Sequence, residues 1–274
     1  MTPPLADVAR RLRHAPVLRR QEWLWARLRP LYRRLQHRRS RRHGITRTVN
    51  GQLFRLRYPF SEIGGDYESV VFRAFAELLR PGMTVFDVGA NVGIYAIAAA
   101  RGVGPDGRVV AFEPARSAAE VMLDHLRLNG VQDRVDVVEA VVDERSGTTE
   151  FWEQGATAAS SVVEAAARIG ERFSDDTAVR VERTSVSIDD FCKQRGAFPD
   201  VVKIDVEGAE GRVVRGAREF LAQRSGSLLL EVHSWALERL GETRDDVLAP
   251  LASAGWSCEL IADDGNTLHY LCEP

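Results

Sequence analysis

The stretch Val85–Gly93 reads VFDVGANVG and continues into a small apolar run at 94–100. A short β-branched and aromatic run, then glycines, then an alanine-rich run is typical of a buried strand that turns into a helix beneath a bound ligand. Gly89 and Gly93 lack Cβ atoms at this turn, where we expect the backbone to approach the ligand closely. We therefore predict a cofactor site at the end of this strand, with the Asp87 carboxylate facing the crevice.

The spacing of the turn argues against a nicotinamide dinucleotide. The G-x-G-x-x-G fingerprint would place glycine at positions 91 and 94, where the chain has Asn91 and Ile94. An NAD(P)-dependent oxidoreductase is therefore kept only as an alternative. A glycine turn that merely joins a strand to a helix is the other alternative for this stretch taken alone.

The residues that follow continue the alternation of strand and helix. Strands are predicted at 85–88, 109–112 and 135–138, and helices at 93–101 and 115–129. Consecutive units of this kind imply a parallel, doubly wound α/β sheet. Glu113 falls at the end of the second strand, where an acid can accept both hydroxyls of a ribose, or can simply stand beside the start of a helix at Pro114. We favour the first interpretation, which indicates an adenosine-bearing cofactor.

Three segments in order carry a family resemblance: DVGANVG at 87–93, GRVVAFEP at 107–114 and VKIDVEGAE at 202–210. Over roughly residues 50–231 the chain resembles the FkbM-type S-adenosylmethionine-dependent methyltransferases. The resemblance implies a class I methyltransferase-like, Rossmann-like fold: a seven-stranded, mostly parallel sheet whose last strand is antiparallel, with helices on both faces. It also implies S-adenosyl-L-methionine as the cofactor.

The cofactor residues follow from the turn, from Glu113 and from the loops that the resemblance places beside them. In such enzymes the loop after the third strand lies against the adenine, and Glu68 stands in the first turn of the helix before the glycine strand. We expect these residues to bind the cofactor: Glu68, Asp87, Gly89, Asn91, Gly93, Glu113, Glu139, Ala140 and Asp205.

The segment at 203–207 carries most of the chemistry. Strand alternation puts Lys203 and Asp205 on one side of the strand, and a buried lysine requires an acidic partner, for which we expect Glu231. Asp205 and Glu207 reach the carboxyl end of this strand, where open α/β sheets bind ligands. His233 follows Glu231 at the end of the next strand.

Methyl transfer to a hydroxyl requires alignment of the acceptor and removal of its proton. We expect His233 or Asp205 to act as the base and Glu207 to orient the acceptor. In an alternative, these three residues and Glu231 hold a divalent ion, but no dedicated ligand spacing is present and no metal is predicted. The predicted reaction is O-methylation of a sugar, glycolipid or polyketide-like molecule. A catalytically silent, membrane-peripheral binding protein is the non-enzymatic alternative.

Charge divides the chain into an extension at 1–44 and a catalytic domain at 45–274. Residues 1–47 carry 14 arginines against Asp7 and Glu22, a net charge of +12, so the remaining 23 basic and 37 acidic residues sum to −14. Apolar residues recur at helical spacing from 17 to 35 and predict a basic amphipathic helix, interrupted at Pro30. Contact with an anionic membrane is one hypothesis, and no nucleic acid is expected. Packing on the catalytic domain, contact with a partner in a homo-oligomer and partial disorder are the other hypotheses.

Smaller signals complete the expected organisation. Asn50-Gly51 predicts a small β-hairpin, and helices are expected at 66–79, with Asp66 as its N-cap, and at 209–221. Residues 148–152 and 179–183 alternate as added strands would. The three cysteines, Cys192, Cys258 and Cys272, are widely spaced and are expected to be reduced thiols. With no secretory signal or membrane-spanning run in the sequence, we expect a cytoplasmic protein, possible membrane association aside.

Overall fold

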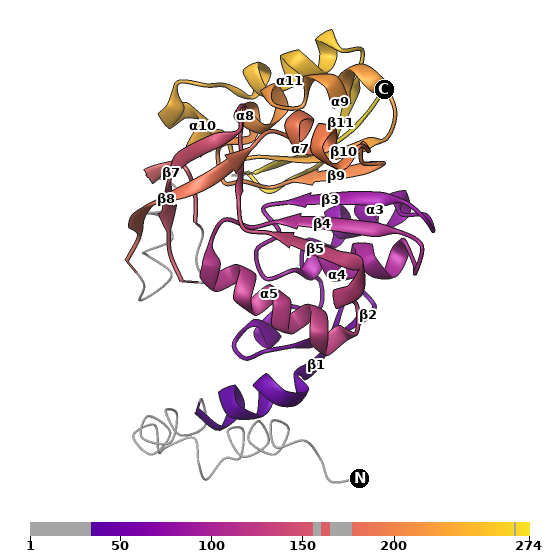
Figure 1. Cartoon of the computed structure of the whole chain (residues 1–274), viewed down its shortest axis with the longest axis vertical. Helices are drawn as coiled ribbons and strands as arrows, with labels where there is room; N and C mark the ends of the chain where they lie inside the picture. Colours follow the sequence, from indigo (N-terminus) through magenta and orange to yellow (C-terminus); the bar gives the residue numbers. More distant parts are fainter. Residues whose placement is uncertain (1–33, 156–159, 165–176, 266) are drawn as a thin grey trace.

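A seven-stranded sheet forms the centre of the molecule (Figure 1). The computed structural model describes residues 34–155, 160–164, 177–265 and 267–274. In spatial order the strands are β11 (Ser257–Asp263), β12 (Leu268–Glu273), β10 (Ser227–Val232), β9 (Val201–Ile204), β3 (Thr84–Val88), β4 (Arg108–Phe112) and β5 (Val135–Val138). Neighbouring strands from β10 to β5 pair in parallel, and β12 pairs antiparallel with both β10 and β11. This confirms the predicted doubly wound, mostly parallel fold.

Helices cover both faces of the sheet (Figure 1). One layer contains α3 (Ser69–Leu78), α4 (Ile94–Gly102) and α5 (Arg116–Asn129), and the other contains α7 (Ile188–Arg195), α8 (Glu210–Arg215), α9 (Arg218–Gln223) and α11 (Arg244–Ser253). Alternate residues of each strand enter different cores: Val85 packs in the α4 layer, whereas Phe86 packs in the α9 layer. Because side chains of a strand alternate between faces, the near-continuous apolar strands are buried on both sides.

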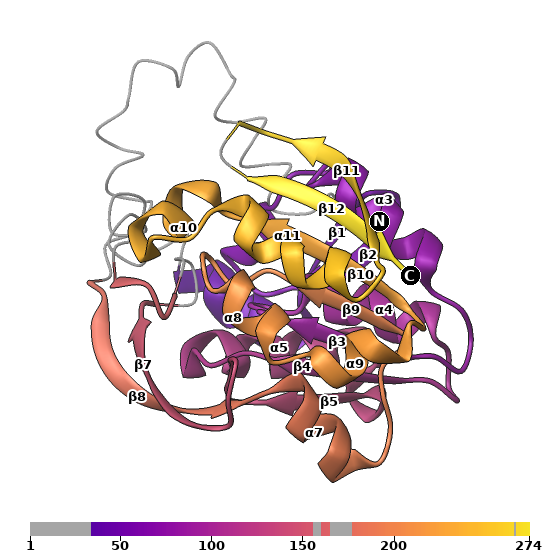
Figure 2. The ribbon, with the colours of Figure 1, turned by 90° about the horizontal axis from the view of Figure 1, so that it is seen from above.

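A smaller sheet stands beside the central one (Figure 2). It consists of β6 (Val141–Val142), β8 (Val179–Val186) and β7 (Gly147–Glu153), in that order. The pairing of β7 with β8 is antiparallel over seven residues, as the alternation at 148–152 and 179–183 predicts. Phe151 of β7 is buried against Ala115 and Ala118 and thereby anchors this small sheet to the start of α5.

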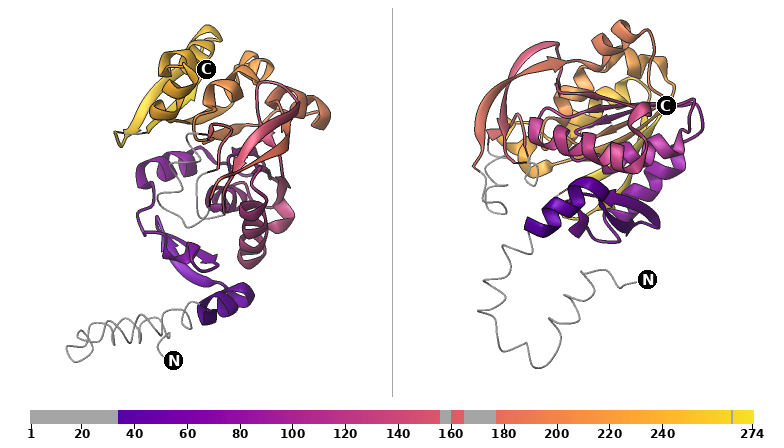
Figure 3. Two further views of the ribbon diagram at one scale, coloured as in Figure 1. Left: turned by 90° about the vertical axis from the view of Figure 1, so that its left-hand side faces the viewer. Right: turned by 60° about the horizontal axis from the view of Figure 1, so that its bottom comes forward.

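The predicted hairpin is present at β1 (Ile45–Val49) and β2 (Gln52–Leu56), joined at Asn50-Gly51. A helix at 34–43 precedes it (Figure 3). Most of the predicted amphipathic helix at 17–35, including Pro30, lies outside the described residues. Within the described part of the chain, no helix has the length and apolar character that crossing a bilayer requires.

Three local predictions are wrong. The helix after the Gly64-Gly65 turn begins at Ser69, with Glu68 rather than Asp66 as its N-cap, because residues 66–68 form a turn and Glu68 is left-handed with φ 43°. The helix expected at 209–221 is two helices, α8 and α9, since Gly216 ends the first where it packs against the backbone of Asp143.

The third concerns the cysteines. Cys258 and Cys272 are direct partners in the register of β11 with β12, and the structure joins them by a disulfide. Only Cys192 is a free, buried thiol among the described residues. The sequence alone does not indicate this pairing because the two cysteines are 14 residues apart. They become neighbours only when β11 and β12 form a hairpin.

Candidate active site

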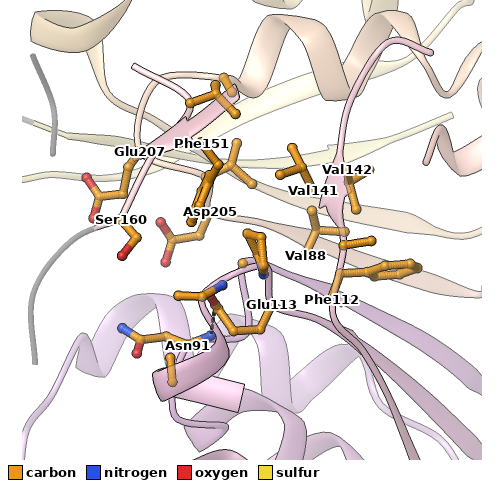
Figure 4. Close-up of a pocket in the computed structure, with 18 residues that line it drawn as sticks. Val88, Asn91, Phe112, Glu113, Val141, Val142, Phe151, Ser160, Asp205 and Glu207 are labelled. Atoms are coloured by element: carbon orange, nitrogen blue, oxygen red, sulfur yellow. Dashed lines mark hydrogen bonds between the residues drawn. The ribbon is translucent and has the colours of Figure 1, made fainter. Parts of the chain in front are cut away.

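A pocket opens at the carboxyl ends of β3, β4 and β9, where a parallel sheet binds ligands (Figure 4). It holds about 690 Å³ of space, part of it open to solvent. Glu113 and Asn91 lie on one side of it, and Asp205, Glu207 and Ser160 lie across from them. Small and apolar side chains complete the lining: Val88, Phe112, Pro114, Ala115, Ala118, Ala140, Val141, Val142, Phe151, Val162, Val206 and Ala209, with Gly89.

The glycines of the turn make room for the chain itself. Gly89 and Gly93 have φ values of +79° and +86°, in the left-handed region that favours glycine. A Cβ at Gly89 would collide with the backbone carbonyl of Asp205, and one at Gly93 would collide with the Met122 side chain. Gly89 lines the pocket and Gly93 does not. The close approach that the structure shows at both glycines is between segments of the protein, and their contact with the cofactor stays a prediction.

Glu113 is where the sequence predicts it, at the end of β4 and in the pocket lining. The residue is only 6% exposed, and its two oxygens accept hydrogen bonds from the backbone amides of Asn91 and Ala115, each at 2.8 Å. Burial raises its pKa to about 7, although these hydrogen bonds oppose the shift. The carboxyl group therefore ties the glycine turn to the start of α5 while it faces the pocket.

Asp87 does not face the crevice as predicted. It has no exposed surface, lies outside the pocket lining and pairs with Lys203 in the register of β3 with β9. Burial raises its pKa to about 6, and the charge of Lys203 opposes that shift. Within the described residues neither carboxylate oxygen makes a hydrogen bond. Its position beneath the site suits electrostatic support of Lys203 rather than direct contact with a cofactor.

Lys203 has a different partner from the one predicted. Its Nζ lies 3.0 Å from Oδ2 of Asp205 and 4.5 Å from the centroid of the Tyr95 ring, and no ion pair with Glu231 forms among the described residues. The Tyr95 hydroxyl in turn donates a 2.7 Å hydrogen bond to Glu68. Burial would raise the pKa of Asp205, but the charges of Lys203 and then His233 outweigh burial and lower it. Asp205 is therefore held as a carboxylate at the edge of the pocket.

His233 lies behind the pocket lining, between three acids. Its Nδ1 is 2.8 Å from Oε1 of Glu210, and its Nε2 is 3.4 Å from both Oε2 of Glu207 and Oε1 of Glu231. Glu210 is fully buried and also accepts a hydrogen bond from the amide of Gly208. This residue received no role in the sequence interpretation. The available signal was its spacing, three residues after Glu207 in the same acidic segment.

The pKa values of Glu207, Glu231 and His233 are all raised above their ordinary values. Burial raises the pKa of Glu207 to about 7 and that of Glu231 to about 9. Burial alone would lower the pKa of His233, but its hydrogen bond to Glu210 and the charge of Glu207 raise it to about 10. The imidazole is thus predominantly a cation near pH 7, and Glu207 changes its charge there.

The other predicted residues divide between the pocket and its surroundings. Ala140 lines the pocket, whereas Glu139 points to solvent, half exposed, with Arg116 at 3.7 Å. Glu68 lies outside the lining and accepts the hydrogen bond from the Tyr95 hydroxyl. The metal alternative has a geometric basis, since ligand atoms of Asp205, Glu231 and His233 lie within 4.8 Å of one another.

Comparison with known proteins identifies the family. The model of the family described as "Methyltransferase FkbM domain" matches residues 87–258. The 31-O-demethyl-FK506 methyltransferase FkbM of Streptomyces tacrolimicus is 32% identical over 179 residues, which cover 57% of this chain and 67% of that protein.

Two solved structures illustrate the similarity in chain course. A methyltransferase FkbM from Methylobacillus flagellatus is 15% identical, with 90% of this chain and 59% of that chain covered and a TM-score of 0.46. Aeropyrum pernix fibrillarin, solved with natively bound S-adenosyl-L-methionine, is 15% identical, with 84% and 82% covered and a TM-score of 0.46.

The family match spans more than half of the sequence and includes the motif at 202–210 that carried much of the resemblance. It confirms the predicted family and, with it, the Rossmann-like fold class and S-adenosyl-L-methionine as the cofactor. Membership of a methyltransferase family replaces the oxidoreductase alternative. The chain belongs to the FkbM family of S-adenosylmethionine-dependent methyltransferases.

Proposed function

We propose that the protein transfers a methyl group from S-adenosyl-L-methionine to a hydroxyl of a sugar, glycolipid or polyketide-like small molecule. The observation that carries this proposal is the charge of the pocket. Its described lining includes three carboxylic acids, Glu113, Asp205 and Glu207, and no lysine, arginine or histidine. Such a lining favours a ligand with a cationic centre and hydroxyl groups, and it disfavours the diphosphate of a dinucleotide.

The pocket residues fit the cofactor in two regions. Glu113 is available to the ribose hydroxyls through the lone pairs that its two backbone hydrogen bonds leave free. Ala118, Ala140 and Phe151 supply an apolar wall that suits the adenine. When bound, the cofactor supplies an electrophilic methyl group on a sulfonium. The ionised Asp205 is suited to stabilise the positive charge of that centre.

Glu207 is the residue best placed to accept the hydroxyl proton. It lines the pocket, 32% of its side chain is exposed, and its pKa of about 7 is matched to proton transfer near neutral pH. The sequence predicts His233 or Asp205 for this role. His233 lies outside the pocket lining and is largely protonated near pH 7, and the low pKa of Asp205 makes it a weak base. We therefore assign proton removal to Glu207.

His233 and Asp205 then support that step. The imidazolium of His233, held at Nδ1 by Glu210, keeps Nε2 beside Glu207 and stabilises its carboxylate form. Asp205, held by Lys203 at 3.0 Å, is placed to orient the acceptor hydroxyl. The two acids thus differ in their neighbours. Asp205, which orients the hydroxyl, is paired with a lysine, and Glu207, which takes the proton, lies beside a histidine.

Two observations support oxygen as the methyl acceptor: the carboxylate that is placed to remove a proton, and the name of a similar protein. An alcohol keeps its proton near pH 7, so its methylation benefits from a positioned carboxylate. The Streptomyces relative is named for an O-demethyl substrate. A small hydroxylated molecule is accordingly the partner we propose, and the cytoplasmic location and a homo-oligomer stay predictions.

Incubation with isotopically labelled S-adenosyl-L-methionine and separated sugar, lipid and polyketide extracts tests this function. We expect label in a product whose fragmentation by mass spectrometry places the methyl group on oxygen. Glu207→Gln should lower the rate by about 10²-fold or more. Glu77→Gln, on the exposed side of α3, is the matched control. Products labelled only at nitrogen, sulfur or carbon, or a Glu207→Gln variant with full activity, would contradict the proposal.

A further inference from the structure

A strongly basic surface lies away from the pocket, at the N-terminal side of the domain. From residue 34 to residue 61 the sequence contains eight arginines and no acidic residue. Five of these arginines are exposed on the helix at 34–43, which Figure 3 shows beside the β1–β2 hairpin. They are Arg34, Arg38, Arg39, Arg41 and Arg42.

The surface is hollowed where three elements meet. Arg42 and His43 come from the end of the helix, Thr46 and Arg55 from the hairpin, and Arg127 with Leu128 from α5. We call these six residues the basic hollow. Several cationic groups around one concavity focus positive potential there and favour a ligand with phosphate groups.

Only one arginine of the basic hollow, Arg127, has an acidic partner among the described residues. Asp124, on α5, is occupied by Arg57 at 2.8 Å and Arg127 at 3.5 Å. Within the described residues, Arg42 and Arg55 form no ion pair. Their charges are therefore available to an external anion.

An exposed leucine adjoins the basic hollow. Leu53 and Arg55 point to the same outer face of β2, opposite Thr48 and Thr46 of β1. Leu53 is 62% exposed, although the next residue along the strand, Phe54, is fully buried. Leu35, on the arginine-rich helix, is also 58% exposed. Apolar side chains beside arginines are typical of surfaces that insert into the boundary between headgroups and acyl chains.

We propose that the basic hollow and Leu53 form a docking surface for an anionic phospholipid bilayer. Headgroup phosphates bind between Arg42 and Arg55, and Leu53 enters the acyl boundary. The exposed leucines favour a bilayer over nucleic acid, for which aromatic or base-reading side chains are the usual complement. This docking is independent of the proposed methyl transfer.

Sedimentation of the full chain with vesicles tests the proposal. Vesicles of phosphatidylcholine alone are compared with vesicles that also contain phosphatidylglycerol, at low and high salt. Arg42→Gln/Arg55→Gln should weaken binding to the anionic vesicles on the order of 30-fold, since each basic residue near such a surface contributes about a five-fold factor. Arg73→Gln/Arg108→Gln, which removes the same charge at exposed positions elsewhere, should leave binding near wild type.

The apolar contribution has its own variants. Leu53→Ser should weaken binding roughly ten-fold, and Val70→Ser, a 53% exposed residue of α3, should not. Equal binding to neutral vesicles, or full binding by the double arginine variant, would overturn the proposal. Equally, tight binding of inorganic phosphate by calorimetry would identify a small-anion site, and preference for a single-stranded oligonucleotide would identify a nucleic-acid surface.

Discussion

Nδ1 of His233 lies 2.8 Å from Oε1 of Glu210, a carboxyl group with no exposed surface. This contact joins the end of β10 to the start of α8 and fixes which imidazole nitrogen faces Glu207. Because the second nitrogen of the ring faces the proposed base, the orientation of His233 is part of the site rather than of the core alone.

Glu210→Gln should lower kcat about ten-fold and leave the dissociation constant of S-adenosylhomocysteine unchanged, because the neutral amide stabilises the imidazolium less well. The pKa of His233, measured by NMR titration, should fall in this variant.

The same substitution should change how stability depends on pH. Because the pKa of His233 is raised in the folded protein, its protonation stabilises the fold fully below the unfolded pKa near 6.5, and this contribution is lost as the pH rises through about 10. Glu210→Gln should therefore destabilise the fold more at pH 6 than above pH 10. Glu242→Gln, another acid that bonds to a cation, is the control.

The pH dependence of turnover should show an acidic limb near pH 7. Glu207 accepts a proton only as a carboxylate, and its pKa of about 7 places the loss of activity below that value. In Glu207→Gln, kcat should be low and nearly independent of pH over the same range. An unchanged acidic limb in this variant would assign the titration to another group.

Gly89→Ala should destabilise the protein by about 2 to 5 kcal/mol, from left-handed strain together with a collision against the Asp205 carbonyl. Gly82→Ala separates the two causes. Gly82 has φ +84° with open space at its Cβ, so only the strain of roughly 1–2 kcal/mol applies. Denaturant unfolding of both variants measures the difference, and equal losses would show that the approach to Asp205 is unimportant.

S-adenosylhomocysteine should raise the melting temperature, and NAD⁺ at the same concentration should not. The three acids in the described pocket lining repel the diphosphate of NAD⁺. A ligand that does bind, at a concentration 100 times its Kd, stabilises the folded protein by about 2.7 kcal/mol. Comparable shifts with both ligands would contradict the electrostatic argument.

Chelation by EDTA should leave turnover unchanged. Asp205 is already paired with the Lys203 ammonium at 3.0 Å, and the protonated imidazole of His233 lies between Glu207 and Glu231, so the cluster supplies its own cations. Loss of activity with EDTA, restored by Mg²⁺ or Mn²⁺, would instead identify Asp205, Glu231 and His233 as metal ligands.

Much of the fold could be predicted from the sequence because its signals are local. The strand at 84–88, the glycine turn and the helix at 94–102 agree closely with the pattern of apolar residues. Two of the three errors in the fold occur where distant segments decide the outcome. Gly216 ends α8 because of its contact with Asp143, and the Cys258–Cys272 pair depends on the register of β11 with β12.

The site was predictable in its location but less so in its contacts. The ends of parallel strands bring Glu113, Asp205 and Glu207 to one pocket, as their positions in sequence imply. The partner of Lys203 and the role of Glu210 depend on side-chain directions across neighbouring elements. Periodicity alone does not specify such directions, so the base and its supporting residue became distinguishable only with their distances and burial.

The small sheet of β6, β8 and β7 has a consequence for how this enzyme can diversify. It contributes Val141, Val142 and Phe151 to the pocket, but its strands are separate from the seven-stranded sheet that holds the acids. Substitutions in this wall can reshape the cavity without moving Asp205 or Glu207. Natural variation or laboratory evolution toward new acceptors is therefore best directed to these three positions. Ser161, which follows β7, is best kept because its hydroxyl donates a hydrogen bond to the Glu207 carbonyl.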